Sequence, residues 1–224
     1  MLKLYNFVIY LFSKIISSIL IFKKVWVYNL LINLSVGEFK YSRYGIKLIN
    51  QNMQEKTYRF CLGGAYGFFF SNYLKEFKKN FILLDFGANI GLYSCIAAKN
   101  NNCNYIYSFE PIKILSKVLK NNLKLNNANA KVLNYGIYSK NIQKEIYFDP
   151  FHTGQSSLLK KENKNFKSKI ICKFINSKRI DKLIQNKPID YIVKIDVEGL
   201  EKIVLKELMS SKIFKKVKSI YIEI

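Results

Sequence analysis

The stretch FILLDFGANIG, residues 81–91, decides the fold of this chain. Its first four residues, Phe81–Leu84, are all apolar, which indicates a short strand buried on both faces. The glycines at 87 and 91 interrupt that strand, and a helical pattern follows over Leu92–Lys99. Glycines allow tight turns and close approach of the backbone to a ligand, and a new helix presents free N–H groups. The stretch therefore predicts a strand, a ligand-binding turn and a helix in succession.

The same alternation of strand and helix continues downstream of this turn. One helix follows Pro111, with Leu115, Leu119 and Leu123 at helical spacing, and another is marked by Leu200 and its helical repeats. Two further segments, 142–148 and 170–175, alternate like the strands of a hairpin. The predicted strands of the alternating region are 81–84, 105–109, 131–138, 189–195 and 217–224. This order predicts an α/β domain with a doubly wound parallel sheet and right-handed crossovers.

Upstream of residue 81 the sequence divides into two parts. Residues 1–37 read as an apolar, basic helical extension that contains no acid before Leu34. A membrane span there would place Lys14 near its centre at a cost of about 2.5–3.5 kcal/mol. A helix on the membrane surface or one packed on the domain are the alternatives, and no cleavage site for a signal peptide follows. Residues 38–80 predict lead-in strands over 41–60, a turn at 63–67 and the end of a helix over 73–79.

The composition is strongly basic, with 37 Lys and Arg against 15 Asp and Glu in 224 residues and a net charge of +22. Such a surplus can attract nucleic acid, anionic lipid or an acidic substrate, although a general compositional bias toward Lys explains it equally. Nearly all the cations are Lys, which suits bidentate phosphate recognition less well than Arg. The four cysteines form no C-x-x-C pair, so we expect reduced, buried thiols in a cytoplasmic protein. Peripheral membrane contact through the apolar N-terminus stays one of the open alternatives.

Three groups of polar residues stand where predicted strands end, and the first two are the turn at 85–91 and Glu110. The turn does not fit the dinucleotide pattern G-x-G-x-x-G, because Asn89 and Leu92 stand at the second and third glycine positions. Glu110 closes the second strand, 23 positions after Gly87, where an acid can accept hydrogen bonds from ribose hydroxyls. A cap for the helix after Pro111 is its alternative role.

A third group, Lys194 to Glu201, follows the fourth strand. Asp196 and Glu198 should face a cleft at the carboxyl edge of the sheet, unless they act only as local caps. Glu201 could simply complement the dipole of the next helix. His152, the only histidine, stands in a predicted loop and reads more readily as a polar surface group than as a base. No cluster of histidines supports a transition metal, and we expect no metal site, although two carboxylates could suit Mg²⁺.

In combination these motifs resemble the FkbM family of methyltransferases. The residues that carry the resemblance are D-F-G-A-N-I-G-L-Y-S at 85–94, F-E-P at 109–111, N-L-K-L-N at 122–126 and K-I-D-V-E-G-L-E at 194–201. The resemblance covers about two-thirds of the chain in the expected order. It implies a class I, Rossmann-like methyltransferase domain over residues 81–224 that uses S-adenosylmethionine.

The resemblance also implies a role for each matching residue. It places Asp85, Gly87, Ala88, Asn89 and Gly91 at the methionine end of the cofactor, Glu110 at the ribose, and Gly136 and Ile137 near the adenine. It places Lys194, Asp196 and Glu198 in the acceptor cleft as catalytic residues, with the two acids as candidate bases for the acceptor hydroxyl. Family members typically methylate a hydroxyl, so we expect a glycan, lipid or small-molecule acceptor.

Two other functions remain open at this point. A nucleic-acid methyltransferase is favoured by the net charge, but the fourth strand is followed by I-D-V-E-G and not by the N-P-P-Y type of motif found in many base-modifying enzymes. A non-catalytic remnant or a membrane-associated binding module is favoured by the apolar N-terminus and by a sheet that is short at its C-terminus. The last two strands of a class I sheet are missing from the prediction, so either this is a truncated form or a partner, such as a second copy of the chain, covers the exposed edge.

Overall fold

The structure, a computed structural model, describes residues 7–11, 32, 34, 36–159 and 168–223. Its centre is a five-stranded sheet with the order β10-β9-β3-β4-β5, in which every neighbouring pair is parallel. The strands are β3 (Phe81–Phe86), β4 (Cys103–Phe109), β5 (Ala130–Leu133), β9 (Asp190–Ile195) and β10 (Val217–Ile222). Each predicted strand has a counterpart in this sheet, although the third one is present only in part. Strand β3 occupies the middle because it is apolar enough to be buried along its whole length.

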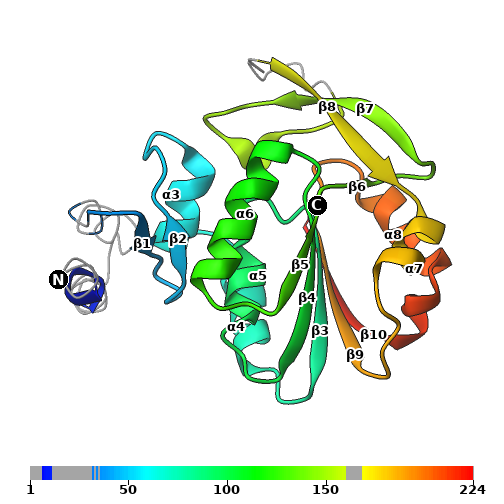
Figure 1. Cartoon of the computed structure of the whole chain (residues 1–224), viewed down its shortest axis with the longest axis horizontal. Coiled ribbons are helices and arrows are strands. Elements are labelled where there is room, and N and C mark those ends of the chain that lie inside the picture. The colour runs from blue at the N-terminus through cyan, green and yellow to red at the C-terminus, as the bar shows by residue number, and fades with distance from the viewer. Residues whose placement is uncertain (1–6, 12–31, 33, 35, 160–167, 224) are drawn as a thin grey trace.

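Helices lie on both sides of this sheet (Figure 1). On one side are α4 (Phe68–Glu76), α5 (Leu92–Ala97) and α6 (Lys113–Leu125), and on the other are α7 (Ser177–Leu183) and α8 (Glu201–Ser210). The leucines of α6 at positions 115, 119 and 123 are buried, as their spacing predicts. A 3-10 turn, Lys212–Lys216, connects α8 to β10. Helix α7 is not apparent in the sequence, because only Ile180 of its seven residues is buried.

A second sheet of three strands lies across one end of the first, at the top of Figure 1. It has the order β6-β8-β7 and contains the predicted hairpin of β7 (Ile142–Phe148) and β8 (Ser168–Ile175). The prediction of one continuous strand over 131–138 is wrong. That segment divides into β5 in the main sheet and β6 (Gly136–Ile137) in the second sheet, because the backbone leaves the β4 ladder after Leu133.

The lead-in segment is fastened to the domain by two asparagines, Asn122 in α6 and Asn126 directly after it. It contains β1 (Phe39–Tyr41), β2 (Lys47–Ile49) and α3 (Lys56–Gly63), so the prediction of strands as far as residue 60 is wrong for its last part. Asn122 accepts a hydrogen bond from the Ile49 N–H at 2.7 Å and donates one to the Ile90 carbonyl at 2.8 Å. Asn126 bonds both backbone groups of Lys47. These asparagines thus replace the hydrogen bonds that a longer sheet would supply to β2.

Most of the predicted N-terminal extension lies outside the described residues. Residues 7–11 are helical, and Tyr10 packs on Tyr41 with ring centroids 4.8 Å apart. Among the described residues no helix is long and apolar enough to cross a membrane. The division of the chain at residues 37 and 80 stays a prediction.

Candidate functional site

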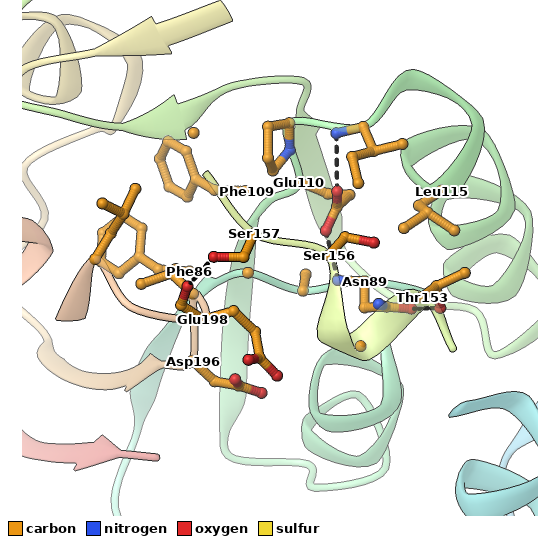
Figure 2. Close-up of a pocket in the computed structure, with 18 of the residues that line it drawn as sticks. Phe86, Asn89, Phe109, Glu110, Leu115, Thr153, Ser156, Ser157, Asp196 and Glu198 are labelled. Atoms are coloured by element: carbon orange, nitrogen blue, oxygen red, sulfur yellow. Dashed lines mark hydrogen bonds between the residues drawn. The ribbon is translucent and has the colours of Figure 1, made fainter. Parts of the chain in front are cut away.

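A cavity of about 130 Å³ lies where β3, β4 and β9 end. The carboxyl ends of parallel strands meet at this edge of the sheet, and open α/β sheets bind their ligands there. Figure 2 shows side chains that reach the cavity from separate parts of the chain, among them Asn89, Glu110, Asp196 and Glu198. The structure therefore brings the three predicted groups of residues together.

The turn between β3 and α5 forms the floor of the cavity. Gly87, with φ of 77°, and Asn89, with φ of 50°, both take the left-handed conformation. A Cβ at position 87 would lie 1.8 Å from the carbonyl oxygen of Asp196, so only glycine lets the turn touch the end of β9. Gly87, Ala88 and Asn89 line the cavity, and their contact with the methionine end of a cofactor stays a prediction.

Gly91 differs from its expected role. It is absent from the described lining of the cavity, and a Cβ there would lie 2.4 Å from the Leu119 side chain. Its φ of 90° and the lack of a side chain allow α5 and α6 to approach each other. Gly91 therefore serves helix packing and does not contact the cavity.

Asp85 also differs from its expected role, because it is fully buried beneath the turn. One carboxylate oxygen accepts a hydrogen bond from the Ser94 hydroxyl at 2.6 Å, and the other lies 3.5 Å from Lys194 Nζ. The cavity is lined by its neighbours and not by Asp85 itself. Asp85 thus stabilises the turn from its buried side, through its contacts with Ser94 and Lys194.

Lys194 reaches the cavity but is engaged by three oxygens of the protein. It donates to the Gly87 carbonyl at 2.7 Å and lies 3.3 Å from Asp196 and 3.5 Å from Asp85. Burial alone would lower its pKa, but these two carboxylates raise it above the ordinary value, so the ammonium stays charged. These contacts tie the turn to β9 and give no support to the predicted catalytic role.

Glu110 is buried at the end of β4 and faces the cavity. One carboxylate oxygen accepts from the Asn89 N–H and the other from the Ile112 N–H, both at 2.8 Å (Figure 2). The second bond is local but is not the helix cap considered above, because α6 begins two residues later than Pro111 predicts and its N-cap, Ile112, makes no side-chain capping bond. Burial raises the pKa of Glu110 to about 7, and the two N–H donors only partly oppose that rise. Each oxygen retains a lone pair for a further donor.

Three carboxyl groups stand at the opposite end of the cavity, on Asp196, Glu198 and Glu223. Glu223 follows β10, was not predicted, and donates its N–H to the Ile195 carbonyl. Its pKa is raised by burial and then by the charge of Asp196. Among the described residues, no group of three or more His, Cys, Asp or Glu side chains is arranged to hold a metal ion. Glu201 stands in the first turn of α8, the position in which an acid complements the helix dipole, and it accepts from the Gly199 N–H.

A loop that sequence reasoning missed covers the cavity. Residues 149–159, here called the covering loop, connect β7 to the segment before β8 and contain the 3-10 turn Thr153–Gln155. The Thr153 hydroxyl donates to Asn89 Oδ1 at 3.2 Å, and its N–H donates to Glu55 at 2.9 Å. The Ser157 hydroxyl donates to the Glu198 carbonyl at 2.5 Å (Figure 2). The run of hydroxyl residues in this loop was the only available signal.

The lead-in segment supplies part of the cavity wall. Thr57, Cys61 and Tyr66 line the cavity, and none of them was predicted. The helix pattern of α3 gave no sign of this contact, because it depends on how α3 docks. His152 does not line the cavity but places its ring against Phe60.

The last two predicted cofactor-binding residues, Gly136 and Ile137, lie beyond Glu110. Gly136 and Ile137 of β6 line the cavity near Tyr135 and Pro111. A Cβ at Gly136 would lie 2.3 Å from the Phe174 ring, so glycine allows β8 to close this side. Their predicted contact with an adenine ring stays a prediction.

These features define an α/β protein whose central parallel sheet carries a ligand cavity at its carboxyl edge. A comparison with protein families matches residues 85–224 to the Methyltransferase FkbM domain, and the chain belongs to that family. A comparison with curated protein sequences found no match.

Two solved structures are similar to part of this chain. One is a tRNA m1G37 methyltransferase of M. jannaschii, with 21% identity, 44% of this chain and 31% of that chain covered, and a TM-score of 0.30. The other is the complex of aTrm5 and tRNALeu, with 20% identity, 44% and 29% coverage, and a TM-score of 0.30. The match spans less than a third of the length of each of these proteins.

Proposed function

We propose that this chain is an S-adenosylmethionine-dependent methyltransferase of the class I, doubly wound type, which methylates a hydroxyl group on a glycan, lipid or small-molecule acceptor. The observation that carries the proposal is the position of Glu110. A buried carboxyl group faces the same cavity as the turn Gly87–Asn89, and two further lone pairs are available to accept from a ribose diol. The family match to a methyltransferase domain supports it.

The lining of the cavity fits the parts of this cofactor. Glu110 would bind the ribose, the turn would lie along the methionine end, and the apolar side chains of Ile112 and Ile137 would border the adenine. The cofactor supplies a methyl group on a positively charged sulfur. The four carboxyl groups that line the cavity, on Glu110, Asp196, Glu198 and Glu223, favour a positively charged ligand.

The acceptor hydroxyl must lose a proton as it gains the methyl group, so a base should stand at the end of β9. Asp196 is the better placed of the two predicted acids. Its side chain lines the cavity, is 31% exposed and is held 3.3 Å from the Lys194 ammonium group. Alignment of the reacting atoms in such an enclosed site can supply about 7–11 kcal/mol of the barrier reduction.

Calorimetric titration of the purified chain with S-adenosylmethionine, and separately with NAD, tests the cofactor. Saturable binding of the first alone is the expected result. Glu110→Ala should weaken that binding by about 1–3 kcal/mol if the carboxylate holds the ribose. No binding to a chain shown to be folded would overturn the proposal. Unchanged affinity of the variant would remove the role of Glu110.

Acceptor chemistry is tested with S-adenosylmethionine carrying a labelled methyl group and a panel of hydroxylated acceptors. Asp196→Asn should slow label transfer at saturating cofactor, because the proton acceptor is lost. Normal turnover in that variant would show that Asp196 is not the base.

The net charge of +22 favours a second candidate, a methyltransferase that acts on nucleic acid. The phosphates of the nucleic acid would have to bind outside the cavity, because the carboxyl groups that line the cavity would repel them. RNA binding that weakens steeply with salt, together with labelled methyl transfer to RNA, would support this alternative.

A further inference from the structure

The Tyr93 hydroxyl is a buried polar group that the proposed function does not use. Tyr93 stands in the first turn of α5, is only 6% exposed and lines the cavity. By distance and angle its hydroxyl makes no hydrogen bond within the described part of the chain, although the Tyr221 side chain lies beside it. A buried hydroxyl without a partner is costly, and its presence calls for a ligand that completes it.

The location of this hydroxyl is fixed by its surroundings. A Cβ at Gly67 would lie 1.8 Å from Tyr93 Oη, so a glycine at the start of α4 leaves room for it. The ring packs on Phe70 at 5.2 Å between centroids and near Tyr221 at 6.2 Å. The chain therefore holds the hydroxyl at the end of the cavity where β9 and β10 finish.

That end of the cavity carries an excess of negative charge. Asp196 and Glu223 both line it, and Lys194 Nζ, which lies 3.3 Å from Asp196, is 5.5 Å from the centre of the Tyr93 ring. Burial raises the pKa of the Tyr93 hydroxyl, and Tyr221, Glu223 and Asp196 raise it further. Lys194 is the only cation among the described lining residues, and it is shared between Asp196 and the buried Asp85. This acidic end is notable in a chain whose net charge is +22.

We propose that Tyr93, Asp196 and Glu223 form a subsite for a primary ammonium group. Such a group has three N–H donors, and the two carboxylates and the phenolic oxygen supply three acceptors. A metal ion is a poorer fit, because the described residues contain no cluster of three or more metal-binding side chains. The ammonium group belongs either to the methionine end of the cofactor or to an amine on the acceptor. The first source rests on the proposed function.

Calorimetry with four probes tests the subsite and separates the two sources. The cofactor probes are S-adenosylhomocysteine, which carries the ammonium group, and 5′-methylthioadenosine, which lacks it. The acceptor probes are D-glucosamine and N-acetyl-D-glucosamine, in which the amine is neutralised, each titrated into protein saturated with S-adenosylhomocysteine. The variants are Glu223→Gln and Tyr93→Phe. The control is Glu145→Gln, an exposed carboxyl group in β7.

If the cofactor is the source, Glu223→Gln should weaken S-adenosylhomocysteine about tenfold or more and leave 5′-methylthioadenosine unchanged. If the acceptor is the source, both nucleosides should bind normally. Glucosamine should then bind more tightly than its acetylated form, and the same variant should abolish that difference. Tyr93→Phe should weaken the same probe several-fold without lowering the unfolding temperature, because the hydroxyl has no partner to lose.

The proposal is overturned if both variants bind all four probes as the wild type and the control do. It is also overturned if Tyr93→Phe lowers the unfolding temperature and leaves every affinity unchanged, since the hydroxyl would then have only a structural role. If the wild type binds neither nucleoside, the proposed function fails. The glucosamine pair, titrated into the free protein, then decides the subsite alone: a preference for the amine that Glu223→Gln removes supports it, and no preference overturns it.

Discussion

Replacing Glu110 with glutamine should change how the stability of the protein depends on pH. Burial raises the pKa of this carboxyl group from 4.5 to about 7, so the folded chain holds the proton more tightly than the unfolded chain does. The stability of the wild type should therefore fall as the pH rises between these two pKa values, from 4.5 to about 7. One pKa unit corresponds to about 1.36 kcal/mol, so the full rise gives a loss of about 3 kcal/mol above pH 7.

Glutamine removes the ionisation but also removes one acceptor. Its amide nitrogen must face either the Asn89 or the Ile112 N–H, which costs about 1–3 kcal/mol at every pH. The absolute stability of the variant is therefore a poor measure, and the comparison across pH is the useful one. Relative to wild type, Glu110→Gln should gain about 2–3 kcal/mol between pH 5 and pH 8, because part of the titration is already complete at pH 5.

Urea denaturation of both proteins at pH 5, 6, 7 and 8 measures this difference directly. The exposed Glu145→Gln variant is the control, and its difference from wild type should stay below about 1 kcal/mol throughout. A constant difference between Glu110→Gln and wild type across this range would refute the reasoning. It would mean that the carboxyl group does not titrate between its ordinary pKa and 7 in the folded chain.

Three further substitutions test the contacts around the cavity. Lys194→Met should destabilise the fold by about 3–5 kcal/mol in urea denaturation, because it leaves the buried Asp85 carboxylate unpaired. Adding Asp85→Asn should recover part of this loss. A Lys194→Met protein within about 1 kcal/mol of the wild-type stability would contradict the reasoning. Asn122→Ala should cost about 2 kcal/mol and speed hydrogen exchange at the Ile49 amide, whereas continued protection of that amide would show that β2 is held by other contacts. Gly87→Ala should lower stability by about 2 kcal/mol or more in thermal denaturation, because the alanine methyl group would meet the Asp196 carbonyl oxygen and position 87 has a positive φ. An unchanged unfolding temperature would show that the turn does not lie against the end of β9.

Much of the main sheet could be predicted from the sequence because its signals are local. Phe81–Leu84 is apolar without interruption, and a strand of that kind has to be buried on both faces. The glycines at 87 and 91 mark the turn for the same reason that the structure needs them there, since both have positive φ. The sequence alone could not distinguish the roles of these two glycines. Gly87 faces the end of β9 and Gly91 faces α6, a difference set by packing between distant segments.

The parts of the site that sequence reasoning missed depend on contacts over long separations. Thr153 meets Glu55, 98 residues away, and Ser157 meets Glu198, 41 residues away. Nothing in the local pattern of either segment signals its partner. Tyr93 was visible within the motif, but its isolation from hydrogen-bond partners appears only when α4 and β10 are packed around it.

The anchoring of the covering loop has a consequence for how this enzyme family can diversify. The family domain begins at residue 85, yet Thr57, Cys61 and Tyr66 form part of the wall, and Glu55 fastens the loop that closes the cavity. The unit that would recognise a ligand is therefore larger than the unit that defines the family. Exchange of residues 38–80 between relatives would alter the shape of the chamber while leaving the turn and Glu110 intact. Chimeras that swap only this segment are thus a rational route to changed selectivity, and a family domain expressed from residue 85 onward would lack a wall of its own binding chamber.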